Sequence, residues 1–358
     1  MRVRCADHSR TTVPSSAPET SPTAPTARRH FLALLGAAFV WTSCGGTTGG
    51  ATAPGNVVRI GHFPNVTHAH GLVAHALSRQ GKGIFEKHLG AGFQVEWHVF
   101  QAGPSAMESV LTGALDACYV GPSPALNAYQ RTQGAEVRVL AGATEGGSAL
   151  VVRTAAGIER PEQLRGRRIA TPQLGNTQDV ACRHWLLDHG IRVTLTGGDA
   201  FVVPTGAADQ LAFFQTGDLD AAWAVEPWVS RLEVQGGGRL LFEEKDATTT
   251  VLVGRAAFVA ERPDLTAALH AAHVELTAWI RANPAEAKAL VRSELETLTR
   301  RPLPSELLDR CWPRLYFTDT VRIETFQTFV DHARATGLTR TTTDLGQLLH
   351  TTAHGDRR

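Results

Sequence analysis

Three short segments join glycine to hydroxyl or amide residues, which are donors suited to an oxyanion. They are Gly-Pro-Ser at 103–105, Gly-Pro-Ser at 121–123 and Gly-Asn-Thr-Gln at 175–178. A helix that begins at such a turn adds unpaired N–H groups and about half a positive charge. The serine and asparagine side chains could instead only cap the following helices. Their joint placement favours ligand contact. The candidate contacts are Ser105, Gly121, Ser123, Asn176, Thr177 and Gln178.

Histidines gather at positions 62, 68, 70 and 75, and imidazoles are common zinc ligands. However, His68 and His70 are only two residues apart, which does not place both rings on one helix face. No Cys-x-x-Cys pair is present among the five cysteines. We therefore predict no metal site and no cofactor, with a histidine-bound metal as the alternative.

Common catalytic motifs are missing from the sequence. It contains no Gly-x-Ser-x-Gly, His-Glu-x-x-His, P-loop or Gly-x-Gly-x-x-Gly motif. The stretch at 121–124 is only superficially similar to a nucleophile turn, because Pro124 interferes with the helix N–H that an oxyanion hole needs. We expect a protein that is not an enzyme.

The segments that must position these residues alternate between strands and helices. Apolar or alternating runs predict strands at 57–63, 93–100, 115–120 and 137–143. Helices are predicted between them, one of them at 69–79, and further helices at 264–282 and 284–295. Such alternation indicates an α/β fold with an open sheet, which binds ligands at the carboxyl ends of its strands.

An internal repeat indicates two similar lobes. The sequence TGALDACY at 112–119 matches TGDLDAAW at 216–223, and a 104-residue offset is too long for a solenoid. β-rich runs at 147–153 and 249–255 read as two strands that cross between the lobes. We predict lobe 1 at 57–147 plus 254–358 and lobe 2 at 148–253, after an export signal and tether at 1–56.

Other candidates lie near the predicted crossing and after the repeat. Gly147 and Ser148 begin the first crossing strand, where glycine permits close approach of a ligand or simply a bend. Glu226 follows a predicted strand and could cap a helix or pair with Arg231. Trp228 could pack against an apolar part of a ligand or belong to the core.

The N-terminus has the features of an export signal. Arg28 and Arg29 precede an apolar run at 31–41, which is too short to span a bilayer and resembles a twin-arginine signal. Small residues before Cys44 resemble a lipoprotein box, so we expect lipidation at Cys44, with ordinary cleavage nearby as the alternative. Residues 45–55 then form a Gly/Thr/Pro tether.

Composition excludes several classes of protein. Among 358 residues, 43% are hydrophobic and the net charge is +1, so the chain can bury a core and lacks the basic field of many nucleic-acid-binding proteins. We expect no nucleic-acid partner.

The motifs together resemble the substrate-binding components of bacterial ABC importers of the nitrate, taurine and aliphatic-sulfonate family. The resemblance covers about residues 59–338. It is carried by IGHFPNVTH at 60–68, GPSAME at 103–108, YVGPSPA at 119–125, TPQLGNTQD at 171–179 and AVEPW at 224–228.

The resemblance implies a type II periplasmic-binding-protein fold with two crossing hinge strands and a ligand between the lobes. It also implies ligand contact by the first loop, at Asn65, Thr67 and His68. A small anionic solute, foremost an aliphatic sulfonate, would be delivered to an ABC permease by a monomeric, exported protein on the outer face of the cytoplasmic membrane.

Several alternatives to an alkanesulfonate remain within this family. They are taurine, nitrate or bicarbonate, and a pyrimidine precursor of thiamine. A different class is an enzyme on the same fold, similar to thiamine pyrimidine synthase, although the Cys-rich motif of that enzyme is absent.

Overall fold

The computed structural model describes residues 56–351. The predicted twin-arginine signal, Cys44 and the tether lie outside the described residues. No helix within 56–351 is long and apolar enough to cross a membrane.

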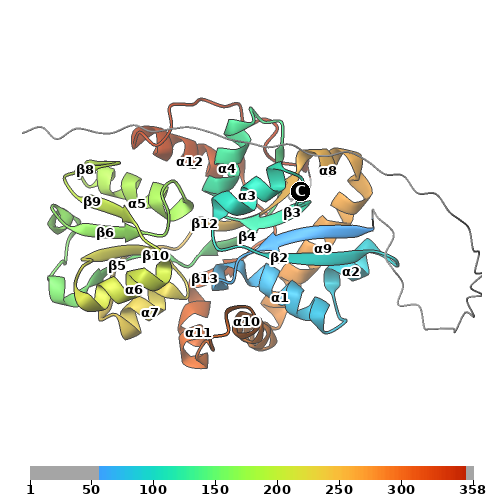
Figure 1. Cartoon of the computed structure of the whole chain (residues 1–358), viewed down its shortest axis with the longest axis horizontal. Coiled ribbons are helices and arrows are strands. Elements are labelled where there is room, and N and C mark those ends of the chain that lie inside the picture. Colours follow the sequence, from blue (N-terminus) through green and yellow to red (C-terminus); the bar gives the residue numbers. More distant parts are fainter. Residues whose placement is uncertain (1–55, 352–358) are drawn as a thin grey trace, which may run out of the picture. The chain divides into compact units, whose positions relative to one another are not determined.

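The first half of the described chain alternates strands and helices (Figure 1). Its elements are β1 (Val57–His62), η1 (Val66–His68), α1 (Ala69–Arg79), α2 (Ile84–Leu89), β2 (Gln94–Val99), α3 (Gly103–Leu111), β3 (Ala117–Val120), α4 (Pro122–Arg131), β4 (Val137–Gly146), β5 (Ser148–Arg153), η2 (Thr154–Ala156), η3 (Pro161–Leu164), β6 (Arg168–Thr171), α5 (Thr177–Asp188), β7 (Val193–Thr194) and β8 (Gly197–Gly198).

The second half closes with a helical tail. Its elements are β9 (Phe201–Pro204), α6 (Ala207–Thr216), β10 (Ala221–Val225), α7 (Trp228–Gln235), β11 (Gly238–Glu244), β12 (Thr248–Arg255), α8 (Ala256–Glu261), α9 (Pro263–Ala282), α10 (Pro284–Thr299), α11 (Ser305–Cys311), η4 (Trp312–Arg314), β13 (Leu315–Phe317) and α12 (Ile323–Ala335).

The strands form two main sheets, one in each lobe. The first has the order β13-β4-β12-β3-β1-β2, and the second has the order β11-β5-β10-β6-β9. In the first sheet β1 runs parallel to β2 and β3, and in the second β6 runs parallel to β9 and β10. The predicted repeat corresponds to α3-β3-α4 in one lobe and α6-β10-α7 in the other.

The chain crosses between the sheets at two neighbouring points. β4 ends at Gly146 and β5 starts at Ser148, while β11 ends at Glu244 and β12 starts at Thr248. Gly146 and Gly147 both have positive φ, and a Cβ on Gly147 would lie 2.4 Å from a Leu315 side-chain carbon. Only glycine suits this tight passage.

The position of the second crossing follows from strand pairing. β11 pairs with β5 of the second sheet, whereas all of β12 pairs with strands of the first sheet. The chain therefore passes between the sheets in the segment from Glu244 to Thr248.

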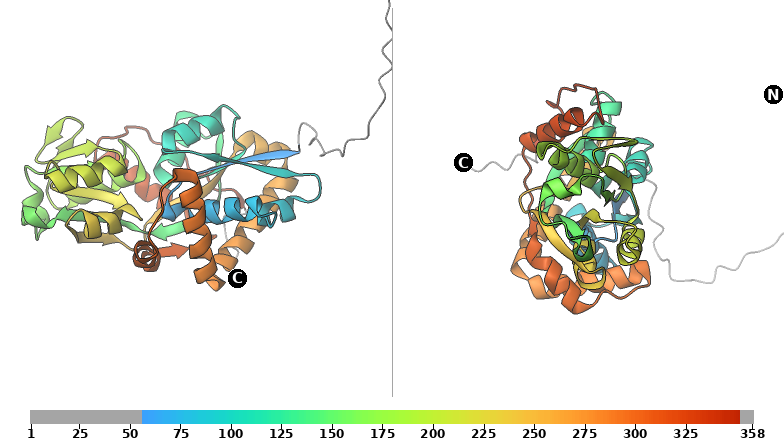
Figure 2. Two further views of the ribbon diagram at one scale, coloured as in Figure 1. Left: turned by 60° about the horizontal axis from the view of Figure 1, so that its bottom comes forward. Right: turned by 90° about the vertical axis from the view of Figure 1, so that its left-hand side faces the viewer.

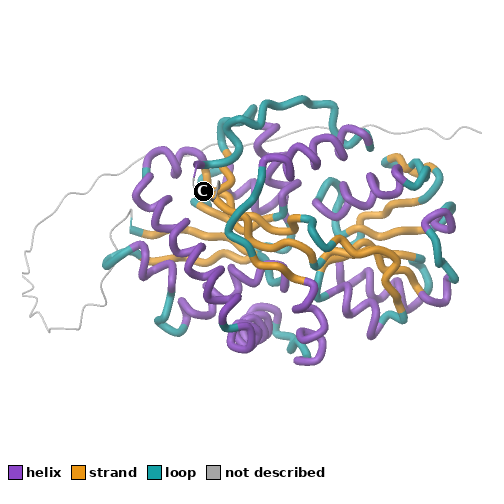
Figure 3. The backbone as a smooth tube through the Cα atoms, turned by 180° about the vertical axis from the view of Figure 1, so that it is seen from behind, coloured by secondary structure: helices purple, strands orange, loops and turns teal. Residues whose placement is uncertain are grey.

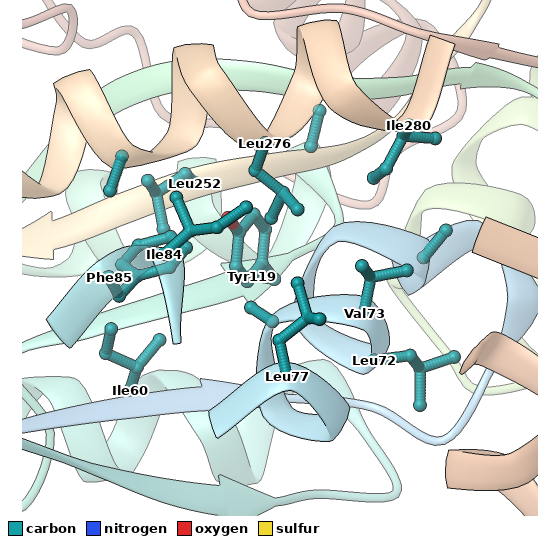
Figure 4. Packing of buried hydrophobic residues seen from close by; sticks show 14 of the residues in the cluster. Ile60, Leu72, Val73, Leu77, Ile84, Phe85, Tyr119, Leu252, Leu276 and Ile280 are labelled. Carbon is teal, nitrogen blue, oxygen red and sulfur yellow. The ribbon is translucent and has the colours of Figure 1, made fainter. Parts of the chain in front are cut away.

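Each sheet is covered by helices on both faces, as Figures 2 and 3 show. On one face of the first sheet, Ile60 and Tyr119 pack with residues of α1, α2 and α9 (Figure 4). On its other face, Cys118 and Val120 pack with residues of α3, α4 and α12. In the second sheet, Leu150 and Val152 face α5, whereas Ala149 and Val151 face α6 and α7. The period-two alternation of strand side chains sets these faces.

Burial keeps several histidines of the first lobe neutral. Burial lowers the pKa of His62 and of His68 to about 3 and that of His273 to about 4, and it lowers the pKa of His70 well below its usual value. The Tyr119 hydroxyl and His273 Nδ1 lie 2.9 Å apart, a distance at which the hydroxyl donates to an uncharged ring.

These depressed pKa values make the fold sensitive to acid. Between pH 6.5 and 4 a histidine of the unfolded chain, with a pKa near 6.5, binds a proton, whereas the buried histidine of the folded chain stays neutral. The free energy of unfolding is therefore highest above pH 6.5 and falls as the pH drops toward 4. Each of these histidines contributes up to about 1.4 kcal/mol of loss per pH unit. Denaturant unfolding between pH 7 and 5 should show this steep loss, and His273→Gln should reduce the slope by about one proton. A stability that is flat over this range would contradict the assignment.

A buried ion pair joins the helical tail to the second lobe. Arg314, next to β13, donates to Glu226 Oε1 at 2.6 Å and to Glu233 Oε2 at 2.8 Å on the α7 side. Glu226 is fully buried, and its other acceptor positions take the N–H and hydroxyl of Ser230. Arg310 reaches Glu233 from a half-exposed position. The two lobes are thus connected by side chains as well as by the crossings.

Removing Arg314 should be far more destabilising than removing Arg310. Arg314→Met leaves Glu226 buried without its cation, which costs about 3–5 kcal/mol. Arg310→Met removes an exposed pair and should cost about 1 kcal/mol or less. Equal losses in the free energy of unfolding for the two variants would show that the Glu226 pair does not hold the lobes together.

Candidate functional site

A cavity of about 850 Å³ lies between the two lobes. Its wall includes η1 and the starts of α3 and α4 from the first lobe, and the starts of α5, α6 and α7 from the second. The end of α10 and the loop after it complete the wall. The strands β1, β3, β6, β9 and β10 all end next to this space.

Five helices begin at the cavity wall. Lining residues include Gly103 of α3, Thr177 of α5, Ala207 of α6 and Trp228 of α7, together with Gly121, which precedes α4. The N–H groups of a first helical turn have no partner within the helix and carry partial positive charge. The cavity therefore suits an anion without depending on a buried lysine.

The start of α5 is fixed by its own side chains. Asn176 accepts a hydrogen bond from the N–H of Asp179 and so caps the helix. Asp179 in turn accepts from the Thr171 hydroxyl and the Gly175 N–H and pairs with the buried Arg183. This network presents Thr177 and Gln178 to the cavity.

The first loop brings Asn65, Thr67 and His68, the residues for which ligand contact is predicted, to the cavity wall. Asn65 caps η1 by accepting from the Thr67 N–H, and the His68 ring stacks on Phe63 at 4.4 Å between ring centroids. Burial lowers the pKa of His68 to about 3, so the ring is neutral at pH 7. His68 Nδ1 is buried and finds no hydrogen-bond partner within residues 56–351. A ligand atom in the cavity could satisfy it.

The starts of α4 and α5 touch across the lobes. The Ser123 N–H donates to Thr177 Oγ1 at 3.4 Å, and Asn127 Nδ2 donates to the Gly175 carbonyl at 3.3 Å. A Cβ on Gly121 would lie 2.6 Å from Thr177 Oγ1, so glycine permits this approach. The Ser123 hydroxyl is buried here without a partner among the described residues, although Ser123 does not itself line the cavity.

Ser105 and Gly147 do not line the cavity, in contrast to the prediction. Ser105 is exposed, and its hydroxyl donates to the Ala102 carbonyl at 2.9 Å. The Leu315 side chain covers Gly147, and this glycine forms part of the tight backbone that crosses between the lobes.

The side chains of Ser148 and Glu226 also form hydrogen bonds with other residues of the protein. The Ser148 hydroxyl donates to Glu244 Oε2 at 2.6 Å, and the indole N–H of Trp223 lies 3.0 Å from the same hydroxyl. Glu226 does help to cap α7, as one interpretation held, but its ion pair is with Arg314 and not with Arg231.

Several lining features went unpredicted, among them the start of α6 and the side chains of Arg231 and Arg301. The repeat offset of 104 residues maps Gly103, where α3 begins, onto Ala207, where α6 begins, so the sequence did carry a signal for α6. Arg231 was considered only as a partner for Glu226. Trp228 does line the cavity, and the Arg231 guanidinium lies over its ring at 4.9 Å from the centroid.

The lining residues carry a net positive charge. With His68 neutral, the two arginines outweigh the single carboxylate of Asp209, which leaves +1 at pH 7. Within residues 56–351, no group of three or more His, Cys, Asp or Glu side chains is arranged to hold a metal ion.

Comparison with known proteins shows consistent likenesses. The model of the NMT1-like family matches residues 51–293. The taurine-binding periplasmic protein of Escherichia coli (strain K12) is 30% identical over 230 residues, which are 62% of this chain and 68% of that protein.

Two solved structures share the fold. The alkanesulfonate-binding protein SsuA from Xanthomonas axonopodis pv. citri bound to MOPS superposes with a TM-score of 0.68 at 19% identity, covering 83% of this chain and 99% of SsuA. The periplasmic nitrate-binding protein NrtA from Synechocystis PCC 6803 gives 0.66 at 16% identity, covering 82% and 86%. These likenesses confirm the two-lobe α/β fold of periplasmic binding proteins.

The relatives are binding proteins by name, in agreement with a chain that lacks the common catalytic motifs. The family model covers more than half of the chain. The chain therefore belongs to the NMT1-like family, and the resemblance of its motifs to the substrate-binding proteins of ABC importers is confirmed.

Proposed function

We propose that this protein is an exported receptor that captures a small oxyanion, foremost an organic sulfonate, between its lobes and delivers it to an ABC permease. One observation carries the proposal: five helices begin at a single cavity whose lining residues have a net charge of +1. Helix N-termini and hydroxyl donors suit a group with several acceptor oxygens and no proton to donate.

The relatives support a sulfonate over the other anions. One relative is named for taurine, which carries a sulfonate head group. The alkanesulfonate-binding and nitrate-binding structures share only the fold with this chain, and nitrate would leave most of an 850 Å³ cavity to water. An organic tail fits the apolar part of the wall, which includes Phe63, Trp228 and Leu298.

The contacts we propose for the head group are at the side of the cavity where α4 and α5 meet. Thr177 supplies a hydroxyl there, and the first turn of α5 supplies N–H groups. The start of α4 contributes its positive helix end, because Pro122 and Pro124 have no N–H and the Ser123 N–H donates to Thr177 Oγ1. His68, with its unpartnered Nδ1, lines the same cavity from the first loop. Ligand binding would then stabilise the contact between lobes by binding the closed arrangement better than an open one.

Capture would take place outside the cytoplasm. The twin-arginine signal and the lipid anchor at Cys44 remain predictions from the sequence, and they would hold the receptor beside its permease at the membrane surface.

Calorimetric titration with propane-1-sulfonate tests this proposal. Thr177→Val keeps the shape of the side chain but removes its hydroxyl, and loss of a hydrogen bond to a charged group should weaken binding about ten- to a hundredfold. Ser105→Ala is the matched control, because its hydroxyl lies outside the cavity, and it should bind as the wild type does. Heat of binding that is absent for sulfonates, or equal affinities for both variants, would reject this site.

A further inference from the structure

Two arginines, the half-buried Arg231 and the exposed Arg301, line the cavity, and no salt bridge within residues 56–351 neutralises either of them. The Nε of Arg231, on α7, is buried and has no hydrogen-bond partner among the described residues. Burial lowers the pKa of Arg231, and the nearby charge of Arg301 acts in the same direction. Arg301 has no carboxylate partner within residues 56–351 either. A buried guanidinium N–H without a partner is costly unless a ligand or water supplies an acceptor.

Neighbouring carboxylates are committed elsewhere. Glu226 and Glu233, which flank Arg231 in the sequence, are both held by Arg314, and Glu233 is also held by Arg310. Asp209 is the only acidic residue of the wall, and it is exposed at the start of α6. The chain thus has carboxylates close to Arg231 and pairs them with other cations.

The arginine pair lies on a different side of the cavity from the proposed head-group contacts. α4 and α5 cover one face of the two sheets, whereas α7 and α10 cover the opposite face (Figure 1). The loop after α10 carries Arg301 together with the apolar Leu303. The cavity therefore has donors toward one face, two arginines toward the other, and apolar side chains in its wall.

We infer that the natural ligand is a sulfonate with a second anionic group at its far end, and that Arg231 with Arg301 binds this second group. The inference rests on the proposed function and specifies its substrate class. A guanidinium fork that lies over the Trp228 ring suits the two oxygens of a carboxylate. A terminal ammonium, as in taurine, would face two like charges.

A matched ligand series tests the inference. Alkanesulfonates with two to six methylene groups are titrated into the purified protein with a terminal methyl, ammonium or carboxylate group. We expect the carboxylate to bind about ten- to a hundredfold more tightly than the methyl compound of the same length, for at least one length, and the ammonium compound to bind most weakly.

Two variants assign the effect to the arginine. Arg231→Gln should abolish the preference for the terminal carboxylate, taken as the ratio of the two affinities in the same variant, while the plain alkanesulfonate still binds. Arg292→Gln, an exposed arginine of α10 outside the cavity, should keep the preference. The melting temperatures of the unliganded variants show whether each remains folded. Arg301→Gln, titrated with the same compounds, measures the contribution of the second arginine.

The outcomes separate this inference from the proposed function. If plain alkanesulfonates bind and the carboxylate adds nothing at any length, or if Arg231→Gln retains the preference, the second subsite is overturned and the sulfonate receptor stands. If no compound of the series binds to the wild type, the proposed function fails, and this inference fails with it.

Discussion

The cavity depends on one constraint, the direction of the strands that end at it. Strands in both sheets end at the boundary between the two lobes, and each of these strands is followed by a turn and a helix. The helices α3 to α7 therefore begin at the same space, and their N-terminal ends, which carry partial positive charge, face it. The two sheets are joined by two short crossings, and Gly146 and Gly147 permit the tight backbone of the first one. In the proposed function, anion affinity would come first from this backbone geometry and only then from particular side chains.

The buried pair of Glu226 and Arg314 has a consequence beyond stability. It joins α7 to the tail segment beside β13, and so it fixes one side of the boundary between the lobes. It also occupies the carboxylate that follows β10, which leaves Arg231 free to serve the cavity. One ion pair thus supports the arrangement of the lobes and the electrostatics of the proposed binding site.

Much of the fold could be predicted from local patterns in the sequence. The helix at 69–79 has the predicted bounds, and the repeat at 112–119 and 216–223 marks the two equivalent βα units. Both could be predicted because each pattern lies within a few consecutive residues. The lining residues of the first loop and of α5 were likewise found, since they follow strands directly. Side-chain pairing over long distances could not be predicted. Arg314 lies 88 positions from Glu226, and no local pattern indicates that it, rather than Arg231, is the partner.

The same limit explains the residues that proved to lie outside the cavity. A turn with glycine and serine looks alike whether the hydroxyl faces a ligand or its own backbone, as Ser105 does. Ser148 sits at a crossing as expected, but Glu244 and Trp223 come from distant segments to engage it. Only the packed structure distinguishes these cases.

The most direct test of the account is the position of a bound head group. Crystals grown with an alkanesulfonate, measured at a wavelength where sulfur scatters anomalously, would reveal the sulfonate sulfur apart from the cysteines and methionines. The account predicts a peak within the cavity, beside Thr177 and the first turns of α4 and α5. A sulfonate peak away from these helix starts, or none in the cavity, would contradict it.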